Sequence, residues 1–136
     1  KPEAARKLIT EIRKAAGGNY IRGNHEMDAF GDAGENRFTI YEGKVLFLHG
    51  HTLRYFEPRA NYWESGRRMV TTPEEMKRAR STDEVFMEAA RLAAEKGCEV
   101  VVFGHTHPDS LIERNINGIR VINVRKGCTY LHIPLE

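Results

Sequence analysis

The sequence predicts a mixed α/β domain built in layers, and three observations support that fold class. Apolar residues recur at helical spacing in two segments, residues 2–18 and 81–97. Short apolar runs, some with alternating polar residues, stand between and after these segments. Two pairs of runs are joined by turn dipeptides typical of hairpins, Glu42-Gly43 and Asn117-Gly118. Helices that alternate with strands, followed by antiparallel hairpins, indicate a layered α/β domain.

The first predicted helix lies in "PEAARKLITEIRKAAGG", which has Pro2 near its start and Gly17-Gly18 at its end. Its apolar face comprises Ala5, Leu8, Ile9, Ile12 and Ala16. "NYIRGN" follows as a short strand that runs into a glycine loop. "RFTIYEGKVLFLHG" then predicts two strands of one hairpin.

An irregular stretch from Thr52 to Arg80 comes next, and within it "EEMKRAR" predicts an exposed helix face. "STDEVFMEAARLAAEKG" predicts a helix that begins with a capping box of Ser81 and Glu84 and ends at Gly97. Its apolar face comprises Val85, Ala89, Leu92 and Ala93. A buried strand is expected over residues 99–103, then a hairpin in "SLIERNINGIRVINV" and an alternating stretch in "TYLHIPL".

Composition limits the class of protein. The 136 residues, 40% hydrophobic and 29% charged, are typical of one soluble globular domain. A formal net charge of +2 does not argue for nucleic acid or a membrane surface, and no apolar run is long enough to span a bilayer. Cys98 and Cys128 stand in no metal or redox spacing. We therefore expect a cytoplasmic protein with two buried, inert thiols.

Five of the six histidines stand just after a predicted strand. His25 follows the first strand, His49 and His51 follow "VLFL", and His105 and His107 follow "VVFG". Loops after the carboxyl ends of strands converge at one edge of an α/β sheet, where ligands bind. Several neutral imidazoles in one cleft are typical of a transition-metal site.

The spacing of His105 and His107 suits two metal ions. In an extended segment, residues two apart point the same way and lie roughly 6–7 Å apart. The metals of dinuclear hydrolases lie roughly 3.5–4 Å apart, so each histidine is expected to reach a different ion. Gly104 is expected to let the backbone bend after the strand. The sixth histidine, His132, is expected to pack rather than to bind metal.

Three blocks, "GNHE", "HGH" and "GHTH", occur in this order, each after a predicted strand. They resemble three of the five blocks of the calcineurin-like metallophosphoesterases, and the resemblance covers residues 19–123. It implies a two-sheet β-sandwich flanked by helices. It also implies hydrolysis of a phosphate ester, as a phosphodiesterase or phosphatase, with two divalent metal ions. Manganese is expected first, and iron, zinc, nickel or cobalt are alternatives.

The resemblance assigns a role to each matching residue. Asn24, His49 and His105 would bind one ion, and His107 would bind the other. His25 would face the substrate phosphate and stabilise its developing charge or protonate the leaving alkoxide. The attacking hydroxide would come from water whose pKa the two metals lower toward neutrality. Support of the site or contact with substrate would fall to Glu26, His51 and Arg54. A solvated position for Glu26 and a plain loop position for His51 are the alternatives.

Two N-terminal blocks of the family, Asp-x-His and Gly-Asp-x-x-Asp, have no counterpart in this sequence. In the family they supply most ligands of the first metal and the bridging aspartate. Only "GDAGE" at residues 31–35 resembles a substitute, and it is not expected to bridge the metals because it lies in a glycine-rich loop rather than after an apolar strand. We expect residues 1–136 to form one domain that lacks its N-terminal strands, part of a longer enzyme, with at most one metal ion well held.

A substrate-recognition insertion is predicted at residues 52–80. Arginines and aromatic rings interleave there, in "LRYFEPRANYWESGRRM". Guanidinium groups bind phosphate in a bidentate manner, and rings stack on bases or cover acyl chains. The alternative is an amphipathic segment that buries its rings against the sandwich.

Three other functions are alternatives to the hydrolase. A protein-interaction scaffold on the same fold is favoured by the missing blocks and opposed by the intact histidines. A metallo-β-lactamase-like zinc hydrolase is suggested by "HTHPD", but Ser110 stands where that pattern needs its last histidine. An amidohydrolase barrel requires a much longer chain. Nucleic acid enters only as a substrate, and no oligomeric state is predicted.

Overall fold

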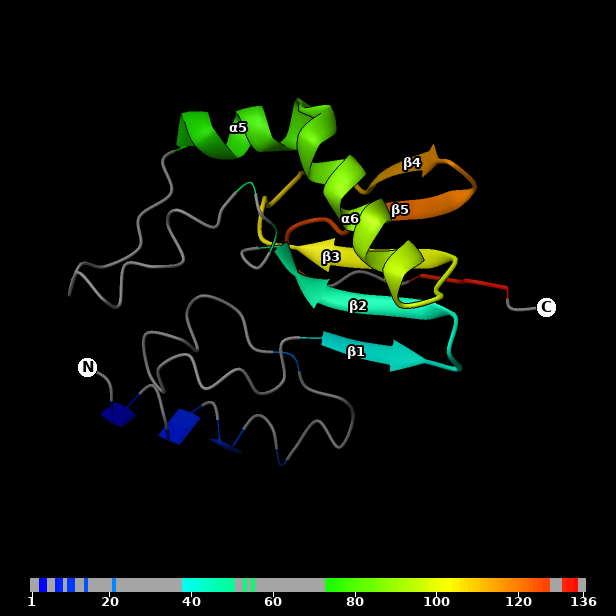
Figure 1. The fold of residues 1–136 in the computed structure, drawn as a ribbon. Helices are drawn as coiled ribbons and strands as arrows, with labels where there is room; N and C mark the ends of the chain where they lie inside the picture. Colours follow the sequence, from blue (N-terminus) through cyan, green and yellow to red (C-terminus); the bar gives the residue numbers. More distant parts are fainter. Residues whose placement is uncertain are drawn as a thin grey trace.

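The structure is a computed structural model that describes residues 3–4, 7–8, 10–11, 14, 21, 38–50, 53, 55, 73–127 and 131–134. These residues form a mixed α/β fold with one five-stranded sheet and two helices that follow one another (Figure 1). The strands are β1 Phe38–Tyr41, β2 Val45–His49, β3 Val100–Gly104, β4 Ile112–Ile116 and β5 Ile119–Asn123. The helices are α5 Pro73–Ser81 and α6 Asp83–Glu95. The predicted α/β class is confirmed.

The sheet has the strand order β1-β2-β3-β5-β4. The three central strands, β2, β3 and β5, run parallel to one another, and each edge strand is antiparallel to its neighbour. The carboxyl ends of the three central strands therefore lie at the same edge of the sheet. The candidate site lies at this carboxyl edge because residues that follow the three parallel strands are close together there.

Helix α6 lies across one face of the sheet (Figure 1). Its apolar residues pack with alternate residues of the central strands because strand side chains point to opposite faces in turn. The rings of Phe86 and Phe103 meet edge to face at 5.8 Å between centres. The core on this face includes Leu46, Leu48, Val85, Phe86, Ala89, Ala93, Val101, Phe103 and Val121. Val85, Ala89 and Ala93 confirm most of the predicted apolar face of the helix, and Leu92 is half-buried.

The opposite face of the sheet is also buried. Val45, Val100, Val102 and Ile122 form its core, with exposed fractions of 6% or less. Leu131 and Ile133 pack against this cluster, while His132 between them is exposed. The alternation predicted for the C-terminal segment is present in its burial, although residues 131–134 form no strand. The prediction that His132 packs was wrong, because the alternation turns it toward solvent.

Both predicted hairpins are confirmed, and their turns explain them. Glu42 and Gly43 have φ values of 54° and 68°, and Asn117 and Gly118 have 51° and 83°. Two successive left-handed residues define the type I′ turn, which matches the twist of the flanking strands. Asn and Gly tolerate this region better than other residues.

The boundary between the two helices differs from the prediction. Ser81 is the last residue of α5, and the N-cap of α6 is Thr82, whose side chain accepts a hydrogen bond from the Glu84 amide. The Thr82 amide itself donates to the Arg78 carbonyl, so one residue serves both helices. Helix α5 lies at the end of a stretch predicted to be irregular, and it confirms the helix predicted for "EEMKRAR". The predicted exposure holds for Glu74, Lys77 and Arg78, whereas Ala79 is buried and Arg80 is half-buried.

Residues described at the N-terminus, among them Lys7, Leu8 and Lys14, are helical as predicted. Leu8, on the predicted apolar face, is 58% exposed. The predicted strand over residues 19–24, the "GDAGE" loop and most of the predicted insertion lie outside the described residues. No helix within the described ranges has the length and apolar character needed to cross a membrane.

Candidate metal centre

Three strand ends form the candidate site. His49 ends β2, Gly104 ends β3 and Asn123 ends β5. The register sets His49 beside Gly104 and Asn123 beside Phe103. The polar residues at and just after these strand ends therefore share the carboxyl edge of the sheet.

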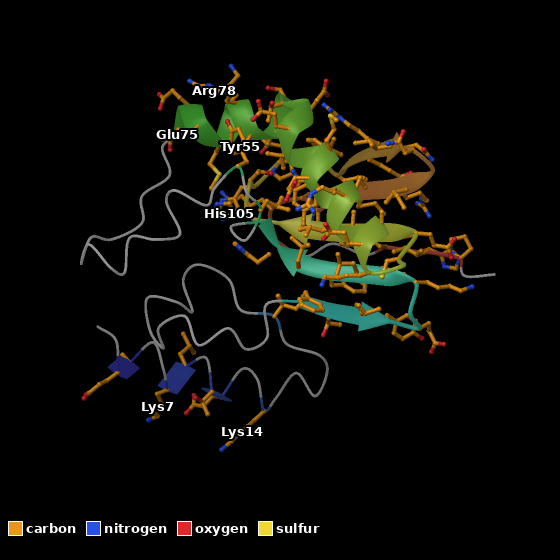
Figure 2. The ribbon with its side chains drawn as sticks, viewed as in Figure 1. Lys7, Lys14, Tyr55, Glu75, Arg78 and His105 are labelled. Carbon is orange, nitrogen blue, oxygen red and sulfur yellow. The ribbon has the colours of Figure 1, made fainter. Side chains whose placement is uncertain are left out.

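His49 and His105 lie in direct contact at this edge. Their ring centres are 4.9 Å apart, with an angle of 66° between the ring planes. His105 is only 4% exposed, and Figure 2 shows it at the strand ends on the side where Tyr55 lies. Two residues 56 positions apart in the chain thus bring imidazoles together, as the convergence of strand ends predicted.

The separation of the two rings fits a shared metal ion. With metal–nitrogen bonds of about 2.0–2.1 Å and ligand angles near tetrahedral or square, two imidazole ring centres lie roughly 4.5–5 Å apart. An edge-to-face ring pair has a similar separation, so the distance admits a metal without requiring one. Among the described residues, no group of three or more His, Cys, Asp or Glu side chains could hold a metal ion. Further ligands would have to come from the rest of the chain or from another source.

The backbone from His105 to His107 is not extended, which corrects the prediction for "GHTH". His105 has a φ of 94° and His107 a φ of 52°, both in the left-handed region. The chain turns sharply after β3, so His105 is buried and His107 is exposed. The two side chains are in different environments because of this turn, whereas an extended segment would point both the same way.

The glycine that this edge needs is Gly50, whereas the sequence pointed to Gly104. A Cβ atom on Gly50 would lie 2.5 Å from the Gly104 carbonyl oxygen and 3.1 Å from the His105 Cβ. A Cβ on Gly104 would meet only Val124 Cγ2, at 3.7 Å, and Gly104 has no positive φ. The close approach of two backbones after β2 and β3 therefore depends on the absence of a side chain at position 50.

Side chains that the sequence did not single out hold the turn after β3. Arg80, at the end of α5, donates from Nη1 to the Thr106 carbonyl at 2.5 Å and to the His107 carbonyl at 3.4 Å. The side-chain amide of Asn123 donates from Nδ2 to the Thr106 hydroxyl, and both of these residues are fully buried. A polar residue that ends a buried strand was the available signal for Asn123, since the same signal identified His49.

The remaining predicted site residues lie outside the described part of the chain: Asn24, His25, Glu26, His51 and Arg54. Their roles stay predictions. The structure brings together His49 and His105, and it places His107 two residues farther along on the exposed side of the same turn.

Cys98 is separate from the site, between α6 and β3, and is 3% exposed. Its burial raises the pKa of the thiol, and the charge of Lys96 opposes that shift. A buried thiol that resists ionisation is a poor nucleophile and a poor metal ligand. The prediction of a buried thiol is confirmed for Cys98, and its inertness stays a prediction; Cys128 lies outside the described residues.

A groove of about 1020 Å³ lies between α6 and the β4–β5 hairpin. Its wall is largely apolar, and the guanidinium of Arg91 at its side is bound by Glu88 and Glu95. The described lining residues include Tyr55, Met87, Ala90, Ile116 and Ile119, and no histidine is among those described. The groove does not extend the candidate metal centre.

Comparison of the chain with protein-family models, with curated proteins and with solved structures gives no match. The fold and the site therefore define a mixed α/β protein with a histidine pair at the carboxyl edge of its sheet, and its function is argued from that geometry.

Proposed function

We propose that the chain belongs to a metal-dependent hydrolase of phosphate esters, of the calcineurin-like metallophosphoesterase type. The observation that carries the proposal is the contact between His49 and His105, which join at one sheet edge from two separate strand ends. Paired imidazoles at this edge, His105 buried and His49 half-buried, suit a divalent transition metal. The burial of both faces of the sheet supports the proposed sandwich, in which this sheet is an inner layer.

The proposed centre uses two divalent metal ions, with manganese first, and these supply the charge that polarises phosphoryl oxygens and lowers the pKa of water. His49 and His105, together with Asn24, would bind one ion, and His107 the other. His25 would face the phosphoryl group and donate a proton to the leaving oxygen. Glu26, His51 and Arg54 would orient these groups or contact the substrate.

The proposed division of ligands between two ions is supported by the different surroundings of the two histidines after β3. His105 is buried beside His49, whereas His107 is exposed beyond the turn. Each is thus available to a different ion even though the segment is not extended.

Metal titration tests the proposal. Calorimetry of the chain with Mn²⁺ is expected to give at most one well-held ion, because the ligands of the second are incomplete. His49→Ala and His105→Ala are each expected to abolish that binding, whereas His107→Ala is expected to leave much of it. His132→Ala, which removes an exposed histidine elsewhere, is the matched control and should bind as the wild type does.

Activity is the second part of the test. Mn²⁺-dependent hydrolysis of bis(4-nitrophenyl) phosphate should fall strongly in His49→Ala and His105→Ala relative to the wild type and to His132→Ala. If both variants still bound Mn²⁺ with wild-type affinity, the assignment of His49 and His105 as metal ligands would be contradicted. A wild-type protein that binds no divalent metal would contradict the hydrolase and leave the protein-interaction scaffold.

A further inference from the structure

The segment from His105 to His107 has a backbone shape that non-glycine residues rarely adopt, and it carries two of the candidate ligands. Both histidines have φ values in the left-handed region. Backbone strain of this kind persists only where surrounding groups over-determine the conformation. The groups that hold this segment therefore decide where the two imidazoles lie.

Two side chains from other elements, Arg80 of α5 and Asn123 of β5, hold the segment by hydrogen bonds. Arg80 Nη1 lies 2.5 Å from the Thr106 carbonyl oxygen and 3.4 Å from that of His107. The Asn123 amide donates to the Thr106 hydroxyl, and both groups are fully shielded from solvent. Backbone hydrogen bonds of 2.8–2.9 Å, from Lys126 to Pro108 and from Val124 to Phe103, fix the chain on either side.

Arg80 differs from the other basic residues of its helix. Lys77 and Arg78 are exposed, and Figure 2 shows Arg78 on the side of α5 away from the sheet. Arg80 is half-buried and is directed at the turn after β3. Its acceptors are two backbone carbonyls, and a charged donor makes such hydrogen bonds stronger than neutral ones.

We propose that Arg80 is a positioning residue for the candidate metal centre. By donating to the Thr106 and His107 carbonyls, it keeps the turn in the left-handed conformation that sets His105 against His49. The consequence for metal binding rests on the proposed hydrolase function. The structural part does not, since the contact between the two imidazoles can be measured in the metal-free chain.

The experiment compares Arg80→Met with Arg78→Met, which removes the same charge from the same helix without touching the turn. Two quantities are measured on each full chain. One is the nuclear Overhauser effect between the His49 and His105 rings without metal. The other is the affinity for Co²⁺, followed by its visible absorption, while the amide spectrum of β3 and β5 reports that the sheet is intact.

Arg80→Met is expected to lose the Overhauser effect between the rings and to bind Co²⁺ about 10- to 100-fold more weakly. Arg78→Met is expected to match the wild type in both measurements. Arg80→Lys, whose ammonium can still donate to a carbonyl, is expected to recover part of both signals.

An Overhauser effect that persists in Arg80→Met would overturn the positioning role, as would an Arg80→Lys variant no closer to wild type than Arg80→Met. A wild-type chain that binds no Co²⁺, but in which ring contact still requires Arg80, would refute the proposed function and support the positioning role. The two failures are therefore distinguishable.

Discussion

His105 and His107 both have a strained backbone near the candidate centre. His107 is exposed, yet its φ of 52° lies in a region that costs a non-glycine residue about 1–3 kcal/mol. His105 departs farther, with a φ of 94°, and is buried. Strain in two residues of one turn, both with imidazole side chains, favours a functional reason for the turn.

The strain at His107 can be measured with two substitutions that remove the same imidazole. His107→Gly and His107→Ala both lose the ring, but only glycine adopts the left-handed region without steric cost. The glycine variant should be more stable than the alanine variant by about 1 kcal/mol in the free energy of unfolding. Urea denaturation of both variants gives this difference, and equal stability would show that position 107 is not held at positive φ.

Gly50 and Gly104 lie at neighbouring strand ends, but only Gly50 lacks room for a Cβ atom. Gly50→Ala would place a Cβ against the Gly104 carbonyl, and backbone cannot yield as a flexible side chain does. Overpacking of this kind costs about 1–3 kcal/mol, and the shift should separate His49 from His105. Gly104→Ala, at the facing position, meets only an ordinary contact and should leave stability and Co²⁺ affinity near wild type. Equal effects of the two substitutions in denaturation and metal titration would contradict this account of the strand ends.

Helices α5 and α6 are joined by a single residue, Thr82. Thr82 ends one helix through its amide and caps the next through its side chain. Thr82→Ala should therefore lower the free energy of unfolding by about 1 kcal/mol. Ser81→Ala should change it by less than about 0.5 kcal/mol, since the Ser81 hydroxyl bonds only to carbonyls of its own helix. Thermal denaturation of both variants tests the assignment, and a larger loss in Ser81→Ala would restore the capping box read from the sequence.

The elements that the sequence predicted correctly are those whose signals are local. The Glu42-Gly43 and Asn117-Gly118 turns specify their own backbone geometry, so both hairpins were found. Gly50 and Arg80 could not be found in this way. Their importance comes from a Gly104 carbonyl and a Thr106 carbonyl, which are distant in sequence and brought near by the parallel pairing of β2 with β3 and by the placement of α5.

The histidine pair lies between these two cases. Its position after strands was visible in the sequence, and the general rule for α/β sheets correctly predicted that His49 and His105 would meet. The same reasoning failed for the backbone of the turn, because a short "GHTH" motif does not specify the sign of φ. Packing against Arg80 and Asn123 supplies that information.

The whole molecule places two hairpin turns at one end of the sheet and the candidate centre at the other. Turns at Glu42-Gly43 and Asn117-Gly118 precede the central strands β2 and β5, whereas His49 and Asn123 end them (Figure 1). A metal ion that binds the folded chain but not the unfolded chain stabilises the fold by about 2.7 kcal/mol when the free metal concentration is 100 times the Kd. That stabilisation should slow the hydrogen exchange of those amides that exchange only when the proposed metal site opens.

Hydrogen exchange followed by mass spectrometry, with and without Mn²⁺, tests this link between the site and the sheet. Peptides from β2, β3 and β5 should exchange up to about 100-fold more slowly with Mn²⁺, because their amides exchange only when the central sheet opens and the metal leaves. Peptides from the two hairpin turns should be unaffected, since local fraying there leaves the histidines in place. His105→Ala should remove the Mn²⁺ effect throughout the central strands. Slowing that is uniform along the chain, or that survives His105→Ala, would mean that Mn²⁺ binds elsewhere, and the assignment of the sheet edge as the metal centre would be wrong.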